Sequence, residues 1–375
     1  MSDRRILYIV SEDASGMRPY ASTILNTILD ENSRAIIVVR DEKSKDSYLS
    51  LPQQNIVYID YPKGKLSRLF WHFYPHVLIR EIKDAIKSHG IELVYTLTAE
   101  ISLAYVANFL FRKVCVLHTV HDAINHDVKY KNVFERLKDN ILVRIPNKEI
   151  IRKAQNLVTN SKPQLEYLQN IFPQKKMFYV PFPTLVNEEI KGGTKTVKEL
   201  ESVNDYILFF GSVNLYKGVH LLYNLYINNK HKFGGRKLVI AGAGNDYFGD
   251  IQDNDVIRIN RYIDDSEVRY LFENAAIVVY PYISATQSGV LSIATYFGKK
   301  ILLSKTPFFE SEVKGSKAVV LADVTNEKEF EDCILNLLNT RAESYDLYEE
   351  IYNDTVLKRN IEKIQEEVLH CNSIK

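Results

Sequence analysis

The chain has 375 residues and a mass of 43.4 kDa, which predicts two or three domains. Its composition, 46% hydrophobic and 25% charged, is that of a soluble globular protein and excludes disordered, collagen-like and disulfide-framework classes. Lys+Arg 48 against Asp+Glu 47 leaves a net charge of +1, which gives no basis for a nucleic-acid partner. The three widely spaced cysteines, Cys115, Cys333 and Cys371, fit a reducing compartment and supply no metal-site spacing.

The first apolar run of the chain is too short for the core of a signal peptide, because Glu12 and Asp13 interrupt it. No uninterrupted stretch of about 18 apolar residues follows, so we expect no membrane span. These features predict a cytoplasmic protein. Contact with a membrane surface stays open.

In the first half of the chain, short β-branched runs alternate with longer segments of helical period. This order is typical of parallel strands joined by crossover helices. Strands are expected at 5–11, 35–40, 55–60, 93–98, 114–120, 156–161 and 177–182. Helices are expected near 18–30, 75–89, 100–112, 133–154 and 163–171.

Residues 184–205 differ in character, with a pair of glycines and many charges, and predict an exposed linker. A second series of alternating elements follows it. Its strands are expected at 206–211, 237–242, 256–260, 276–282, 300–304 and 318–323, with helices near 217–229, 266–274, 289–298 and 326–340. The helical tail after Glu343 has no strand behind it, and we expect it to cross back to the first domain.

The sequence therefore predicts an α/β protein with two Rossmann-like domains that face each other across a cleft. The first domain is expected to comprise residues 1–183 together with a C-terminal helix at about 355–375. The second is expected to comprise residues 206–354. Open parallel sheets bind ligands beyond the carboxyl ends of their strands, so candidate residues are those directly after strands.

Two places in the first domain satisfy this criterion. Gly16 lies between the first strand and a helix, where a glycine lets backbone approach a ligand closely, although an ordinary turn glycine would look the same. His121 follows the strand 114–120 and precedes Asp122, with which a purely structural histidine could also pair. His118 lies on the opposite face of that strand and is expected in the core.

The loop that follows also contains His126 and Asp127, which raises the question of a metal site. No HExxH or similar helix-borne spacing accompanies them. We therefore expect no metal ion.

In the second domain, Gly211 ends a strand and Lys217 stands at the start of the next helix. A lysine there can project to the same place as the free N–H groups of the helix, and both favour an anion such as phosphate. The GxxxxGK[ST] pattern of a P-loop is absent. A solvated surface lysine would have the same sequence context.

A second anion-binding signal follows the strand 276–282. Thr286, Gln287, Ser288 and Gly289 come together where the next helix begins, and offer hydroxyls, an amide and free backbone N–H groups. An N-capped helix without a ligand would also account for them. Exposed charge–dipole contacts are worth only about 0.3–1 kcal/mol each, so this terminus and Lys217 would have to act together.

Seven segments in this order resemble family 4 glycosyltransferases of the GT-B fold. They are SGMRPY, HTVHD, LVTNSKPQLEYL, MFYVPFP, FFGSVNLYKGVHLL, LVIAGAGN and AIVVYPYISATQSGVLSIATYFGKKILLS. The resemblance covers residues 5 to about 340 and is most specific over 206–305. It implies a nucleotide-sugar donor held mainly by the second domain, an acceptor held mainly by the first, and transfer with retention of configuration. It implies neither a metal nor a cofactor.

Carried over residue by residue, the resemblance makes Gly16 the loop glycine near the donor diphosphate and His121 the histidine near the transferred sugar. Lys217 would contact the diphosphate. The resemblance also implies that Ser161 lines the cleft, and we expect Asp122 to lie there with it. The backbone amides of the phosphate-binding helix would come from Ser288, Gly289 and Val290.

This sequence departs from the family pattern at two points. Ser212 stands where an arginine usually follows the glycine of the FFG strand, and the two glutamates that many members carry seven residues apart are absent. We expect Gln287 to replace some of the lost hydrogen bonding to the ribose. Arg261, after the strand 256–260, is our candidate for the lost positive charge.

Segment 61–80, which ends at Arg80, contains four Lys/Arg residues and no acidic residue. Phe70, Trp71, Phe73 and further aromatic residues lie among these basic residues. Basic and aromatic residues together suit contact with an anionic lipid surface, which would fit a lipid-linked acceptor. The alternative is an ordinary loop and helix with its aromatic side chains turned inward.

We therefore expect a glycosyltransferase that uses a UDP- or GDP-sugar and a glycan or lipid-linked acceptor in the biosynthesis of a surface polysaccharide such as capsule or lipopolysaccharide. A sugar-nucleotide 2-epimerase would need acid and base carboxylates that we do not identify. A non-catalytic sugar-nucleotide-binding subunit is the other alternative, because the glutamate pair and the arginine are missing. The sequence gives no oligomeric state.

Overall fold

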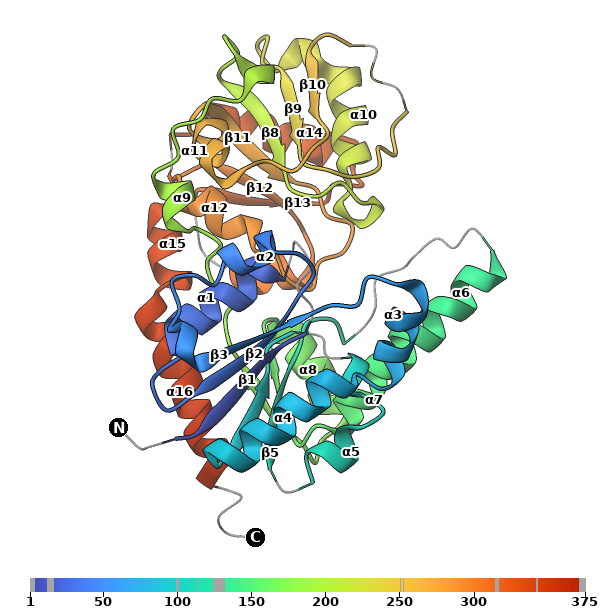
Figure 1. Ribbon diagram of the computed structural model, residues 1–375. Coiled ribbons are helices and arrows are strands. Elements are labelled where there is room, and N and C mark those ends of the chain that lie inside the picture. The colour runs from blue at the N-terminus through green and yellow to red at the C-terminus, as the bar shows by residue number, and fades with distance from the viewer. Residues whose placement is uncertain are drawn as a thin grey trace. The chain divides into compact units, whose positions relative to one another are not determined.

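The structure is a computed structural model, and it describes residues 4–11, 17–98, 101–112, 114–123, 132–249, 251, 253–313, 317–341 and 343–370. The chain forms two compact units (Figure 1). Unit 1 comprises Met1–Pro183 and Asp354–Lys375, and unit 2 comprises Thr184–Asn353. Each unit is described by itself.

Unit 1 contains, in its described residues, a seven-stranded parallel sheet of order β3-β2-β1-β4-β5-β6-β7. Along the chain, β2 and β3 are added on one side of β1, and β4 to β7 are then added on its other side. The switch point of this sheet therefore lies between β1 and β4. The strands are β1 (Ile6–Val10), β2 (Arg34–Val39), β3 (Ile56–Asp60), β4 (Leu93–Thr96), β5 (Cys115–Val120), β6 (Asn156–Thr159) and β7 (Lys176–Tyr179).

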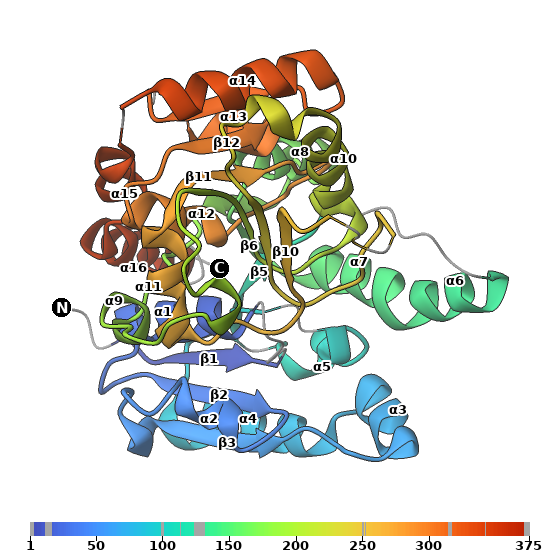
Figure 2. The ribbon, with the colours of Figure 1, turned by 90° about the horizontal axis from the view of Figure 1, so that it is seen from above.

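Helices cover both faces of this sheet (Figures 1 and 2). Because side chains alternate along a strand, Leu7 of β1 packs in one core cluster with Ile82 of α4, whereas Tyr8 points to the other face. There the Tyr8 hydroxyl accepts a hydrogen bond of 3.0 Å from Gln365 of α16. The α-helices are α1 (Arg18–Ile28), α2 (Lys43–Asp46), α3 (Lys65–Phe73), α4 (His76–His89), α5 (Ala107–Leu110), α6 (Val133–Asp139), α7 (Ile145–Lys153), α8 (Lys162–Ile171) and α16 (Asp354–His370).

Three short segments complete unit 1 and alter two expected helices. The 3₁₀ turns are η1 (Gln53–Asn55) and η2 (Ile101–Leu103). The helix expected near 100–112 is thus reduced to η2 and α5. The helix expected near 133–154 is present, but a π-helical segment, η3 (Asn140–Arg144), separates α6 from α7.

Unit 2 contains, within the part of the chain described, a six-stranded parallel sheet of order β10-β9-β8-β11-β12-β13. This is the strand order of a doubly wound Rossmann-like sheet, with its switch point between β8 and β11. The strands are β8 (Tyr206–Phe210), β9 (Leu238–Ala241), β10 (Val256–Ile259), β11 (Ala275–Tyr280), β12 (Ile301–Ser304) and β13 (Val319–Ala322). The expected α/β fold with two Rossmann-like sheets is confirmed.

The helices of unit 2 lie on both sides of its sheet (Figure 2). The α-helices are α9 (Glu188–Lys191), α10 (Val219–Asn229), α11 (Asp265–Glu273), α12 (Val290–Tyr296), α13 (Pro307–Glu312), α14 (Glu327–Asn339) and α15 (Tyr345–Ile351), and the 3₁₀ turns are η4 (Lys198–Leu200), η5 (Leu215–Lys217) and η6 (Lys230–Lys232). Among the described helices, none has both the length and the apolar character needed to cross a membrane.

Residues 184–205 are not the exposed linker that we expected. They contain α9 and η4, and the side chains of Val197 and Leu200 are fully buried in the core of unit 2. The high charge of the segment concealed these anchors, because the apolar residues are spaced irregularly between the charged ones. The segment is therefore structurally a part of unit 2.

Candidate functional site

The carboxyl ends of β8 and β11 meet at the switch point of unit 2. These two strands are paired side by side, and the chain leaves them toward opposite halves of the sheet. Such a point is where open α/β sheets leave a crevice for a ligand. The predicted residues Gly211 and Lys217 follow β8, and the predicted residues 286–290 follow β11.

The turn that carries Lys217 docks closely on the segment after β11. Gly218 has φ +64°, and a Cβ added there would lie 1.9 Å from the carbonyl oxygen of Pro281. The backbone N–H of Ile283 donates a 2.8 Å hydrogen bond to the carbonyl oxygen of Tyr216. Only glycine combines this left-handed conformation with so close an approach. The two strand-end segments thus fix each other, and they fix the position of Lys217.

The Lys217 ammonium lies between aromatic rings at this edge. Its Nζ donates a 2.7 Å hydrogen bond to the Tyr282 hydroxyl, and lies 4.2 Å from the centroid of the Tyr282 ring and 5.7 Å from that of Tyr216. Burial lowers the pKa of Lys217, and the nearby Tyr216 opposes this shift. A half-buried cation gains more from a bound anion than a fully solvated cation does.

Tyr282 connects this lysine to the start of α12. Its side chain is buried, and burial raises the pKa of the Tyr282 hydroxyl. The Ser288 hydroxyl, itself buried, lies beside that phenol and counters part of the rise, although it does not reach full hydrogen-bond geometry. The structure therefore brings Lys217 and Ser288 to one place, with Tyr282 as their common neighbour.

Gly211 and Val290 are also neighbours at this edge. A Cβ added at Gly211, where φ is +129°, would lie 3.6 Å from Cγ1 of Val290. The carbonyl oxygen of Val290 in turn accepts a 3.1 Å hydrogen bond from the Tyr280 hydroxyl of β11. Gly289 is the residue before α12 begins. The first turn of α12 therefore stands directly over the end of β8.

Three further predicted donor residues have accessible side chains near these elements. Ser212 is exposed, and its hydroxyl accepts a 3.2 Å hydrogen bond from Asn214. Thr286 and Gln287 are half-buried between β11 and α12. Their positions are compatible with contacts to a ligand at the same edge, and their donor role stays a prediction.

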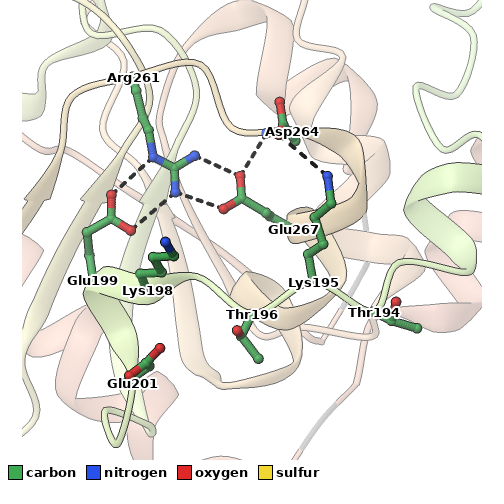
Figure 3. A pocket seen from close by; sticks show the side chains of 9 residues that line it. All are labelled: Thr194, Lys195, Thr196, Lys198, Glu199, Glu201, Arg261, Asp264 and Glu267. Carbon is green, nitrogen blue, oxygen red and sulfur yellow. Dashed lines mark hydrogen bonds and ion pairs between the residues drawn. The ribbon is translucent and has the colours of Figure 1, made fainter.

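Arg261 belongs to a different cluster, in a cavity of about 680 Å³ (Figure 3). Its guanidinium donates to Glu267 at 2.7 and 2.8 Å and to Glu199 at 3.0 and 3.2 Å. These hydrogen bonds lower the pKa of both carboxyls. The charge of Arg261 is therefore already balanced by two carboxylates, which compete with the phosphate role that we predict for it.

In unit 1, His121 is buried and tied to the backbone. Its Nε2 donates a 2.8 Å hydrogen bond to the carbonyl oxygen of Leu97, just after β4, and its ring meets the ring of Tyr20 edge-on at 4.8 Å. His118 is buried as well, with Nδ1 2.6 Å from the Thr96 hydroxyl. Burial lowers the pKa of His118 to about 3. His118 is thus a neutral core histidine, as expected.

The other predicted residues of unit 1 also take part in internal hydrogen bonds. Ser161 is buried and caps α8, where its side chain accepts a hydrogen bond from the N–H of Gln164. Asp122 is half-buried, and its carbonyl oxygen accepts a 2.9 Å hydrogen bond from Asn147. Gly16, His126 and Asp127 lie outside the described residues.

Two contributors to the site were missed at the level of sequence. Tyr216 and Tyr282 surround Lys217, yet we singled out neither of them. The available signal was position alone, because Tyr282 stands just past β11 and Tyr216 just before the lysine. Within the described ranges, no group of three or more His, Cys, Asp and Glu side chains is placed to hold a metal ion.

Comparison with known proteins supplies the class. Residues 194–354 match the model of the family described as Glycosyl transferases group 1. A comparison with curated protein sequences finds no match.

Solved structures with the same fold are similar over almost the whole chain. One is Alr3699/HepE of Anabaena in complex with UDP and glucose, with 13% identity, a TM-score of 0.67, and coverage of 97% of this chain and 100% of the other. Another is sucrose-phosphate synthase of Thermosynechococcus elongatus, with 14% identity, a TM-score of 0.67, and coverage of 98% and 100%. The pneumococcal O-GlcNAc transferase GtfA in complex with UDP and GlcNAc has 10% identity, a TM-score of 0.64, and coverage of 98% and 99%.

The fold and the family match together define the class of protein. The likeness to solved structures establishes the GT-B fold, and the family match over 194–354 establishes the enzyme class. The chain is a glycosyltransferase of the GT-B fold.

Proposed function

We propose that the enzyme transfers a glycosyl group from a nucleoside-diphosphate sugar, with retention of configuration and without a metal ion. The acceptor in this proposal is a glycan or a lipid-linked saccharide, and the product is a precursor of a surface polysaccharide. In this proposal the transfer reaction takes place in the cytoplasm, at the inner face of the membrane. Alr3699/HepE and GtfA were solved with UDP, which favours UDP over GDP as the donor nucleotide.

One observation carries the proposal: the contact of Lys217 and Ser288 with the same tyrosine at the switch point of unit 2. An ammonium and the first turn of a helix both favour an anion, and here they lie at the edge where the fold places ligands. The buried Ser288 hydroxyl, which lacks a full hydrogen bond, is a further donor for a phosphate oxygen.

The chemistry follows from where charge develops. When the sugar leaves the donor, negative charge grows on the β-phosphate, and prepositioned donors stabilise that state more than the ground state. In the proposal Lys217 and the amides of residues 288–290 take this role. His121 is the proposed side chain for orienting the transferred sugar, held by its hydrogen bond to Leu97. The proton of the acceptor hydroxyl passes to the leaving phosphate.

The test is Lys217→Ala, with turnover of a panel of UDP- and GDP-sugars as the assay. We expect kcat/KM to fall by at least about tenfold, which corresponds to about 1.4 kcal/mol of transition-state stabilisation. Lys237→Ala is the matched control, because Lys237 directly precedes β9 and therefore lies at the amino ends of the strands of the same sheet, away from their carboxyl ends. A smaller loss would remove Lys217 from the mechanism.

The panel also separates the alternatives for the whole chain. Hydrolysis or transfer of a donor supports the proposal. An isomerised sugar nucleotide would indicate an epimerase, and binding without turnover would indicate a non-catalytic subunit.

A further inference from the structure

An apolar stripe of helix α3 faces solvent instead of the core. Leu66, Leu69, Phe70 and Phe73 are spaced i, i+3, i+4 and i+7, the spacing that normally marks the buried face of a helix. Leu66 and Phe70 are nevertheless each 73% exposed, and Leu69 and Phe73 are exposed too. Trp71, on the other side, is buried. The helix is thus anchored by Trp71, and its main apolar stripe stays largely exposed among the described residues of unit 1.

Helix α6 has a similar face. Val133 and Phe134 are 82% and 80% exposed, and Leu137 and, in η3, Ile141 continue the exposed row. Single exposed apolar residues are ordinary, but contiguous patches mark sites of association. Two helices of one unit with exposed apolar faces therefore indicate a site of association.

The two helices belong to one surface. Each follows the carboxyl end of a strand, α3 after β3 and α6 after β5, and both lie on the same side of unit 1 in the two views (Figures 1 and 2). Tyr105 connects them: its ring lies 5.4 Å from that of Phe73, and its hydroxyl donates a 3.5 Å hydrogen bond to the carbonyl oxygen of Ile141. We call this the α3–α6 surface.

Positive charge borders the α3–α6 surface. Residues 61–79 contain no Asp or Glu, and Lys63, Lys65 and Arg68 are exposed there. Residues 133–153 contain six Lys/Arg against three Asp/Glu. Two of those acids are already paired, Asp139 with Arg144 at 2.8 Å and Glu149 with Arg152 at 2.9 Å.

We infer that the α3–α6 surface docks on an anionic lipid bilayer. Apolar side chains that enter the interface while Lys and Arg side chains reach the headgroups are what such a surface requires. A second copy of the chain would fit less well, because a symmetric dimer through this face would set its basic borders against each other. The inference rests on the proposed function and specifies where a lipid-linked acceptor would be met, beside the carboxyl edge of the sheet in unit 1.

The experiment is co-sedimentation of the full chain with phosphatidylcholine vesicles that contain or lack phosphatidylglycerol. We expect binding only to the anionic vesicles. Leu66→Ser/Phe70→Ser and Phe134→Ser/Leu137→Ser should each lower the partition coefficient by at least about tenfold. Leu49→Ser/Val57→Ser is the matched control, since both side chains are exposed elsewhere on unit 1 and should not matter.

A second set of variants tests the charge. Replacing Lys63, Lys65 and Arg68 by Ser should lower binding by at least about tenfold and weaken its salt dependence. The control replaces Lys83, Lys87 and Lys363, also exposed, and removes the same charge. Equal losses in both sets, equal binding to neutral vesicles, or a dimer that the apolar variants dissociate without any vesicle binding would each overturn the inference.

Donor turnover with a soluble acceptor keeps the two proposals apart. The apolar variants should retain it, because they change exposed side chains of unit 1, whereas Lys217 belongs to unit 2. A chain that binds anionic vesicles but turns over no sugar nucleotide would refute the proposed function and support the α3–α6 surface.

Discussion

The two sheets share a strand order around their switch points, yet the residues at their carboxyl edges are used differently. In unit 2, the edge after β8 and β11 collects a half-buried ammonium, two tyrosine rings and a buried hydroxyl without a full hydrogen bond. In unit 1, the predicted residues His121 and Ser161 are tied to the protein, to Leu97 and to the start of α8, whereas Oδ1 of Asn160, just after β6, is buried without a hydrogen-bond partner.

The two edges therefore differ in charge: among the predicted residues in the described part of the chain, those of unit 2 supply a cation beside a buried hydroxyl that lacks a full hydrogen bond, and those of unit 1 do not. Polar groups whose hydrogen bonds are already made stabilise a fold, whereas buried groups left short of partners are suited to a ligand. Strand order alone would assign both edges the same role. The charge and the hydrogen bonds of particular side chains are what distinguish them.

The largest effect should come from the turn that forms the edge of unit 2. In Gly218→Ala, the new Cβ would clash with the Pro281 carbonyl oxygen, and residue 218 would have to keep a left-handed backbone conformation. We expect the free energy of unfolding to fall by about 3 kcal/mol or more, and donor binding to be lost. Gly235→Ala is the control, since its φ of +76° gives the same strain but nothing lies within 4 Å of the added Cβ. Thermal unfolding followed by circular dichroism, and donor titration, measure both. Equal losses in the two variants would contradict the close docking.

Acid should destabilise unit 1 through His118. Burial lowers the pKa of His118 to about 3 from its usual value of 6.5. Below pH 6.5, the unfolded chain therefore binds a proton at this histidine that the folded chain does not bind. This contribution to the unfolding free energy is present above pH 6.5 and is lost as the pH falls toward 3, by up to about 1.4 kcal/mol per pH unit.

Trp71 is the only tryptophan of the chain and lies in unit 1, so its fluorescence during urea unfolding reports on this unit. His118→Asn should flatten the pH dependence relative to the unaltered protein. An unchanged slope would show that His118 does not control it.

The tyrosine between Lys217 and Ser288 should have a smaller effect, on activity more than on stability. Tyr282→Phe keeps the ring under the ammonium but removes the 2.7 Å hydrogen bond, so Lys217 is held less firmly. We expect kcat/KM to fall about tenfold with a similar melting temperature. Tyr226→Phe is the control, because its hydroxyl bonds to backbone in the core of the same unit. A tenfold loss in that control as well would make the effect of Tyr282 structural.

The smallest effect tests whether Ser161 supports the fold or contacts a ligand. Ser161→Ala removes the cap of α8 and should cost about 1 kcal/mol of stability. Thr306→Ala, which removes the cap of α13 in unit 2, should cost about the same. Urea unfolding and donor turnover are measured together. A fall in kcat/KM for Ser161→Ala beyond that of Thr306→Ala would favour the predicted role in the cleft.

Each strand expected from the sequence has a counterpart in the described residues, because buried parallel strands produce short β-branched runs that few other elements share. Short helices were harder. α9 and α13 have four and six residues, too few for a helical period to stand out, and both were missed.

At the candidate site, the sequence located Lys217 and Ser288 but not their common neighbour. Tyr282 is one of 24 tyrosines, and its role depends on a contact with Lys217 across 65 positions of the chain. The partners of Arg261 were missed for the same reason, since Glu199 is 62 positions away. Position after a strand is a local property that a sequence displays, whereas the partner of a charge is decided by tertiary packing.

Helix α16 has a consequence for synthesis of the protein on the ribosome. It packs on unit 1, where Gln365 bonds to Tyr8 and Ile361 is buried, yet all of unit 2 precedes it in the chain. During translation, unit 2 can acquire its complete set of strands before the nascent first unit receives its last helix. The amino-terminal sheet must therefore wait, with the face around Tyr8 uncovered, until residues 354–370 have left the exit tunnel.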